Sequence, residues 1–265
     1  MHHRLIEALI PAVRDAGALI ERIRLSGIVT RNKADASPVT EADEQAERLL
    51  TAAIAAADPD ALIVGEEACA AGIRPDPCAR FWLVDALDGT KDFIAGGTDY
   101  SVNIALIDAG VPVLGLVLAP RDGTLWIGAT GLGAFCERAG GRRAPIATRA
   151  MGDRPVVVTS RSHLDDQTRA YCAAIPGADT RQSGSSLKFC LLAEGLADVY
   201  PRFGPTSEWD TAAGDAVLRA AGGTTRHPDG RVFDYGKREF LNGAFLAVGD
   251  PSAVERLPSL TGILA

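Results

Sequence analysis

Phe81-Trp82-Leu83-Val84-Asp85-Ala86-Leu87-Asp88-Gly89-Thr90 runs from four apolar residues into two carboxylates, a glycine and a threonine. The apolar residues predict a buried strand that delivers Asp85 and Asp88 at its end. Because these two residues are three positions apart around a tight turn, both carboxylates can face one point. The backbone carbonyl of Leu87 lies between the two carboxylates and offers a further oxygen that could bind a cation.

Two other acidic segments also join an apolar run to a turn or a helix start, namely Gly65-Glu66-Glu67 and Trp209-Asp210. Carboxylates roughly 4 Å apart repel by about 4 kcal/mol at an effective dielectric near 20, so converging acids need cations or protons. An all-oxygen donor set favours Mg²⁺, with Mn²⁺ as the alternative, over zinc. We therefore expect a metal site built from Glu66, Asp85, the Leu87 carbonyl, Asp88 and Asp210.

Gly89 and Thr90 follow the acidic pair directly. Glycine lets the backbone approach an oxyanion closely, and N–H groups at a helix start donate to it. Two hard cations at such a place activate water and neutralise the leaving oxygen in phosphate ester hydrolysis. The segment thus predicts a phosphate site in which metal supplies the positive charge.

Composition restricts the partners. The chain has 265 residues, 47% of them hydrophobic, and a net charge of −7, which argues against a nucleic-acid polymer as ligand. Five scattered cysteines without a C-x-x-C pair fit reduced thiols. The N-terminus lacks the apolar core of a signal peptide, and no apolar run approaches the ~20 residues that span a bilayer. We expect a cytoplasmic protein.

The order of elements predicts two lobes. Helical periodicity starts near Leu5 and resumes after the capping box at Thr40-Glu41-Ala42-Asp43. Short apolar runs follow from Leu62 to Cys136, and the turn residues 108–110 and 121–123 that separate three of them predict an antiparallel meander. Strands and helices alternate afterwards, with strands expected at 155–159 and 197–200 and helices at 165–173, 185–194 and 210–221. We place an α+β lobe at 1–143, with most metal ligands, and an α/β lobe at 144–265, with Asp210 and the nucleotide-side residues.

Each acidic residue also has an ordinary structural explanation. Asp85 and Asp88 suit an Asx turn that closes a strand. Glu66 suits a solvated loop, Asp210 a helix N-cap, and Asp43 the acid of its capping box. Spacing alone does not show that these residues meet.

Taken together, the three segments resemble the inositol monophosphatase superfamily of metal-dependent, lithium-sensitive phosphatases. The family pattern is Gly-Glu-Glu, then Asp-Pro-x-Asp-Gly-Thr after an aromatic strand, and much later Trp-Asp-x-x-Ala-Gly. Here the motifs are Gly65–Glu67, Asp85–Thr90 and Trp209–Gly214. Ala86 replaces the usual proline, which shapes the turn and binds no metal.

The resemblance narrows towards the bacterial 3′(2′),5′-bisphosphate nucleotidases of the CysQ type. Asp88–Phe93 is similar to their Asp-Gly-Thr-Lys-Glu-Phe, and Gly184–Cys190 and Tyr200–Thr206 look like their second-lobe signature. Lys91 is the discriminating residue, since inositol phosphatases usually lack a lysine at that position.

This resemblance implies a two-lobe alternating layered sandwich (αβαβα) of the inositol monophosphatase/fructose-1,6-bisphosphatase type. It implies two or more Mg²⁺ ions, with Asp85 between two of them, Glu66 on the first, and Asp88 and Asp210 on the second. It also pairs Asp43 with Thr90. With Glu66, these two residues would position and deprotonate the attacking water.

The activity implied is Mg²⁺-dependent removal of the 3′-phosphate from adenosine 3′,5′-bisphosphate, with action on its sulfated precursor and a place in sulfur assimilation. The resemblance also allows peripheral attachment to the cytoplasmic face of the inner membrane. Inositol-1-monophosphatase or another small sugar phosphate phosphatase is the enzymatic alternative, and a noncatalytic phosphometabolite-binding protein or a structural partner is the alternative of another class. The expected substrate-binding residues are Glu66, Leu87, Asp88, Gly89, Thr90, Lys91, Ser185, Ser186, Lys188, Arg202 and Asp210.

Overall fold

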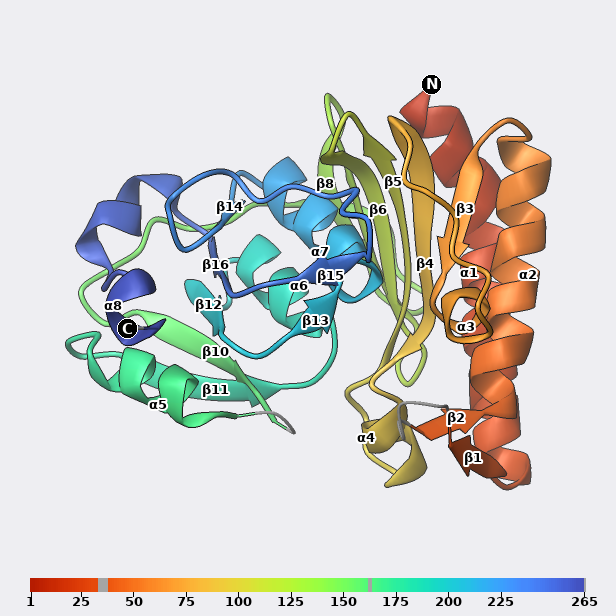
Figure 1. Ribbon diagram of the computed structural model, residues 1–265, viewed down its shortest axis with the longest axis horizontal. Helices are drawn as coiled ribbons and strands as arrows, with labels where there is room; N and C mark the ends of the chain where they lie inside the picture. The colour runs from red at the N-terminus through yellow and green to blue at the C-terminus, as the bar shows by residue number, and fades with distance from the viewer. Residues whose placement is uncertain (33–37, 162–163, 265) are drawn as a thin grey trace.

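Helical layers and sheets alternate in the computed structural model, which describes residues 1–32, 38–161 and 164–264 (Figure 1). Helices α1 and α2 cover one face of a seven-stranded sheet, and α6 and α7 cover its other face. A five-stranded sheet follows, and α5, η1 and α8 pack on its outer side. The predicted αβαβα sandwich is confirmed.

The first lobe begins with two helices that bury apolar stripes. In α1 these residues recur every three or four positions, and in α2 the Thr40–Asp43 capping box closes the first turn as expected. The elements that precede the long strands are α1 (His2–Ser26), β1 (Thr30–Asn32), β2 (Pro38–Thr40), α2 (Glu41–Ala57), β3 (Leu62–Gly65) and α3 (Glu66–Ala70).

The seven-stranded sheet has the order β3-β4-β5-β6-β7-β8-β9. The strands from β4 onward pair antiparallel, as the meander predicts, whereas β3 pairs parallel to β4. The remaining elements of this lobe are β4 (Arg80–Asp88), α4 (Thr90–Ile94), β5 (Ser101–Asp108), β6 (Val111–Ala119), β7 (Thr124–Ala129), β8 (Gly133–Glu137) and β9 (Ala144–Ile146).

The second sheet has the order β11-β10-β12-β16-β14, and β13 and β15 form a separate pair. The elements of this lobe are β10 (Val156–Ser160), α5 (Asp166–Ala173), β11 (Asp179–Ser183), α6 (Leu187–Ala193), β12 (Val199–Arg202), β13 (Thr206–Ser207), α7 (Trp209–Ala220), β14 (Thr224–Arg226), β15 (Leu241–Asn242), β16 (Phe245–Val248), η1 (Pro251–Arg256) and α8 (Thr261–Leu264).

Several expected boundaries lie elsewhere, among them those of the strand expected at 197–200, which spans Val199–Arg202. The strand expected to end at Val84 continues to Asp88. The helix expected at 185–194 begins only at Leu187, because Ser185 adopts a φ of 49°, which a right-handed helix does not allow. The lobe division at 143/144 falls just before β9, which is still a strand of the first sheet.

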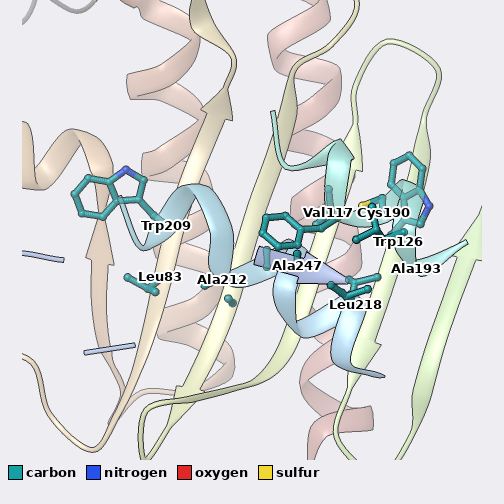
Figure 2. Packing of buried hydrophobic residues seen from close by; sticks show 14 of the residues in the cluster. Leu83, Val117, Trp126, Cys190, Ala193, Trp209, Ala212, Leu218 and Ala247 are labelled. Carbon is teal, nitrogen blue, oxygen red and sulfur yellow. The ribbon is translucent and has the colours of Figure 1, made fainter. Parts of the chain in front are cut away.

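Helix α7 lies directly on β6 and β7 because two glycines leave room for its backbone. A Cβ on Gly115 would lie 2.3 Å from the Ala213 carbonyl oxygen, and one on Gly128 would lie 2.4 Å from Cα of Val217. The close approach joins both lobes in a single apolar cluster. Figure 2 shows its members from the first sheet, from α6 and α7, and from β16, among them Leu83, Val117, Trp126, Cys190, Ala193, Trp209, Ala212, Leu218 and Ala247.

None of the helices in the described ranges is both long enough and apolar enough to cross a membrane.

The glycine contact makes a prediction about stability. Gly128→Ala places a methyl group where Val217 already lies, so we expect a loss of about 1–3 kcal/mol in the free energy of unfolding, measured in urea. Gly152→Ala is the control, since a Cβ there meets open space. Equal stability of the two variants would show that α7 does not depend on this approach.

Candidate active site

A β-bulge brings the two aspartates of β4 to one side. Asp85 pairs with Asn103 and Asp88 pairs with Ser101, so three steps along β4 correspond to two steps along β5. In a regular strand, residues three apart point to opposite faces. The extra residue reverses this alternation, and Asp85 and Asp88 both line one cavity. Sequence spacing predicted the convergence but assigned it to a turn after the strand.

Glu66 reaches the same cavity through strand register. Gly65, the last residue of β3, is the parallel partner of Val84 on β4. The next residues along the chain are Glu66, which begins α3, and Asp85 of β4, so the register sets these carboxylates side by side. The antiparallel meander expected from the sequence gave no indication of this parallel contact.

Asp210 comes from the other lobe, in the first turn of α7. Its Oδ2 accepts a hydrogen bond from the Ser207 N–H at 2.8 Å, which orients the carboxylate. Carboxylate oxygens of Glu66, Asp85 and Asp210 all lie within 4.8 Å of one another. Two strands of the first lobe and a helix of the second thus bring three acids together.

The electrostatics of this cluster fit a divalent cation. Burial raises the pKa of Asp88 to about 6, with the Glu66 charge adding to the effect. Burial raises the pKa of Asp210 well above its ordinary value, and the Asp88 and Glu66 charges raise it further. Acids that resist ionisation because of burial and of one another's charge are stabilised as anions by a shared cation. The residues that could hold it are Glu66, Asp85, Asp88 and Asp210, with the Leu87 carbonyl.

Asp43 and Thr90 form a pair behind the cluster. The Thr90 hydroxyl lies 2.9 Å from Asp43 Oδ1 and 3.1 Å from the Leu87 carbonyl oxygen, and both are acceptors. Asp43 Oδ2 accepts from the N–H and the hydroxyl of Thr40. Asp43 is therefore both the acid of the capping box and the hydrogen-bond partner of Thr90, as expected. Burial raises the pKa of Asp43, although the hydrogen bonds from Thr40 and Thr90 oppose the shift.

Gly89 allows the chain to turn at this point. Its φ is 95°, and an added Cβ would lie 2.8 Å from the Asp99 carbonyl oxygen. Both facts exclude other residues, since L side chains rarely adopt this φ and the space is occupied. The turn starts α4 at Thr90 and returns the Thr90 side chain to Leu87.

The cavity has a volume of about 290 Å³, close to the lower end of small-molecule sites. It lies between the lobes and receives side chains from both. The predicted site residues that line it are Glu66, Asp85, Leu87, Asp88, Gly89, Thr90, Lys91, Ser185, Lys188, Arg202 and Asp210.

Two cationic side chains of the second lobe face the acids. Lys188 is buried, and its ammonium donates to the Ser185 carbonyl and lies 5.2 Å from the centre of the Tyr200 ring. Burial lowers the pKa of Lys188 to about 8, although the Asp88 charge opposes this shift. Arg202 donates to the carbonyls of Gly204 and Pro205, which orients its guanidinium.

Ser186 is placed differently from the expectation. It is buried, its hydroxyl donates to Asn103 Oδ1 at 2.6 Å, and it is within hydrogen-bonding distance of the Ser101 hydroxyl. The side chain therefore joins α6 to β5 and does not line the cavity. Its backbone N–H, however, is close enough to Asp88 to lower the pKa of that carboxyl. The expected contact of the Ser186 side chain with substrate is corrected to a contact between the lobes.

Sequence reasoning missed several cavity residues. The sequence indicates Tyr200 only as a member of the segment 200–206. An aromatic residue two positions before Arg202 on a strand could have indicated a residue of the cavity. Asp99 had no signal, because it lies in a loop. There it accepts hydrogen bonds from the Gly184 N–H at 2.7 Å and pairs with Arg161 at 3.0 Å, so it links the lobes at the cavity edge.

Comparison with known proteins agrees with this geometry. The family model described as "Inositol monophosphatase family" matches residues 1–258. The chain belongs to the inositol monophosphatase family. Among curated relatives, a protein named 3′(2′),5′-bisphosphate nucleotidase CysQ from Salmonella typhimurium is 42% identical over 244 residues, which are 91% of this chain and 98% of the relative. A protein of the same name from Escherichia coli is 45% identical, over 81% of this chain and 86% of the relative.

Solved structures of the inositol monophosphatase family show the same arrangement. CysQ from Bacteroides thetaiotaomicron superposes with a TM-score of 0.78 at 32% identity, covering 94% of this chain and 98% of that one. An IMPase from Thermotoga maritima gives a TM-score of 0.78 at 25% identity, with 96% of each chain covered. The family and the fold expected from the motifs are both confirmed.

The acidic cluster predicts opposite effects on stability with and without metal. Asp210→Asn removes one charge from a repelling group and keeps an acceptor for Ser207, so we expect a metal-free melting temperature equal to or above that of the wild type. Mg²⁺ at 100 times its dissociation constant should stabilise the wild type by about 2.7 kcal/mol, and this gain should be lost in the variant.

The control is Asp76→Asn, an exposed charge removal outside the cavity. It should keep the whole Mg²⁺ effect in differential scanning fluorimetry. A normal Mg²⁺ effect in Asp210→Asn would exclude Asp210 from the metal site.

Proposed function

We propose that this chain is a Mg²⁺-dependent 3′(2′),5′-bisphosphate nucleotidase that hydrolyses the 3′-phosphate of adenosine 3′,5′-bisphosphate to give AMP and phosphate. The observation that carries the proposal is one interlobe cavity lined by an acidic cluster, by Thr90, and by the cations of Lys91, Lys188 and Arg202. The names of relatives at 42% and 45% identity support the same activity.

The metal ligands of the proposed enzyme are Glu66, Asp85, the Leu87 carbonyl, Asp88 and Asp210. Two or more Mg²⁺ ions, when bound, would activate water and neutralise charge on the departing oxygen. Mn²⁺ would serve the same oxygen donors. The protein contributes a fixed arrangement of these donors, because the β4 bulge, the β3–β4 register and helix α7 each hold a part of it.

Thr90 and Asp43 supply the path for the proton of the attacking water. When the Thr90 hydroxyl donates to Asp43, its oxygen keeps lone pairs that can accept from a water on the cavity side. The raised pKa of Asp43 makes this buried carboxylate a better proton acceptor near neutral pH. Glu66 lines the same wall and would hold the water in line with the phosphate.

Positive charge on the cavity wall opposite the acidic cluster suits a substrate with two phosphates. The scissile 3′-phosphate would lie over the acidic cluster, close to Gly89 and Thr90. The 5′-phosphate would then meet the cations of the other wall, Lys188 and Arg202, with Lys91 beside the scissile group. Tyr200 supplies an aromatic face there. An inositol monophosphate has no second phosphate for these cations.

A cytoplasmic site of action stays a prediction from the sequence, and the action on the sulfated precursor of adenosine 3′,5′-bisphosphate stays one as well.

Substrate preference tests the proposal directly. With purified protein and Mg²⁺, phosphate release should be fastest from adenosine 3′,5′-bisphosphate and slower from inositol 1-phosphate and fructose 1,6-bisphosphate. The panel includes 3′-phosphoadenosine 5′-phosphosulfate. Preference for inositol 1-phosphate or fructose 1,6-bisphosphate would replace the nucleotidase by a sugar phosphate phosphatase, and binding of all substrates without turnover would favour a noncatalytic protein.

Thr90→Val tests the proton path. Valine has nearly the same shape but lacks the hydroxyl, so we expect kcat to fall by about 10²–10⁴. Mg²⁺ stabilisation should stay as in the wild type, because the Thr90 side chain is not among the proposed metal ligands. A kcat within a factor of two of the wild-type value would remove Thr90 from the reaction.

A further inference from the structure

Helix α3, which begins with Glu66, has no cap of its own. Its N-cap residue is Gly65, which has no side chain to accept the first N–H groups. Glu47 of α2, which precedes Glu67 by twenty residues in the chain, caps the helix instead. Its carboxylate oxygens accept from the N–H of Glu67 at 2.7 Å and from the N–H of Ala68 at 2.9 Å.

The contact is closely fitted and buried. Glu47 is only 7% exposed. A Cβ on Gly65 would lie 2.5 Å from the Glu47 carboxyl carbon and 2.5 Å from one of its oxygens. The carboxylate therefore occupies the space that a side chain at position 65 would take, and Gly65 has an ordinary φ of −102° that alanine could adopt.

Glu66 lies between two fixed points. On one side, Gly65 is held by the pairing of β3 with β4. On the other side, the N–H groups of Glu67 and Ala68 are held by Glu47. A helix of five residues cannot maintain its first turn alone, because nucleation is unfavourable. The direction of the Glu66 side chain consequently depends on the Glu47 contact.

We propose that Glu47 is a positioning residue that aims Glu66 at the metal site, an inference that rests on the proposed metal binding by Glu66. Helix α2 then positions two parts of the site, the pair of Asp43 with Thr90 and the metal ligand Glu66. Asp43 and Glu47 are four residues apart on one helix face. Asp43 holds Thr90, and one turn further along Glu47 holds the helix start that carries Glu66. A single rigid helix fixes the distance between the two.

The test measures Mn²⁺ binding without substrate, by electron paramagnetic resonance of free Mn²⁺. Loss of a residue that orients a metal ligand typically weakens metal binding by about 10–100-fold, and we expect this for Glu47→Ala. Glu47→Gln keeps one carbonyl oxygen and should be intermediate. Glu44→Gln is the control, since Glu44 lies on the same helix and pairs with Arg31 away from α3.

Gly65→Ala gives a second variant that leaves Glu47 in the chain. It should weaken Mn²⁺ binding in the wild-type background, because the methyl group displaces the Glu47 carboxylate. In the Glu47→Ala background it should add little. All variants are compared at a temperature where circular dichroism shows them folded.

Wild-type Mn²⁺ affinity in folded Glu47→Ala and Gly65→Ala would overturn the inference and reduce Glu47 to a stabilising contact. The same holds if Gly65→Ala weakens binding equally in both backgrounds. Absence of Mn²⁺ binding by the wild type would instead remove the proposed metal role of Glu66, and this inference with it.

Discussion

Mutual repulsion of clustered carboxylates is the constraint that organises this molecule. Glu66, Asp85 and Asp210 have oxygens within 4.8 Å, and burial and neighbouring charges raise the pKa values of Asp88 and Asp210. Such a group would separate if the chain were free to relax. It is held by elements that are fixed elsewhere, in two strands of one sheet and in a helix clamped between two sheets.

Several local features could be predicted from the sequence because each has a local cause. The apolar run before Asp85 determines a strand, and the Thr40–Asp43 capping box determines a helix start. Gly89 predicts the tight turn, where φ is 95° in the structure. The family pattern then related segments that are far apart in the chain. The eleven expected residues that line the cavity include all the expected metal ligands.

The remainder depends on contacts that no local pattern encodes. The bulge in β4 exists only relative to β5, and the parallel pairing of β3 exists only relative to β4. Ser186 was assigned to the substrate because of its segment, but its side chain faces Asn103, a residue 83 positions away. No local pattern in the sequence indicates a function for Glu47, and its function as a cap appears only when α3 is in place. Asp99 is a similar case.

The position of α7 has a consequence for how the protein must be assembled. This helix belongs to the second lobe by sequence, yet its apolar face completes the core of the first lobe and seats against Gly115 and Gly128. A fragment that ends after β9 would expose a broad apolar face of its sheet to water and would be prone to association. The two lobes are therefore halves of one cooperative unit, and a complete acidic cluster cannot form before the chain has been made at least as far as α7.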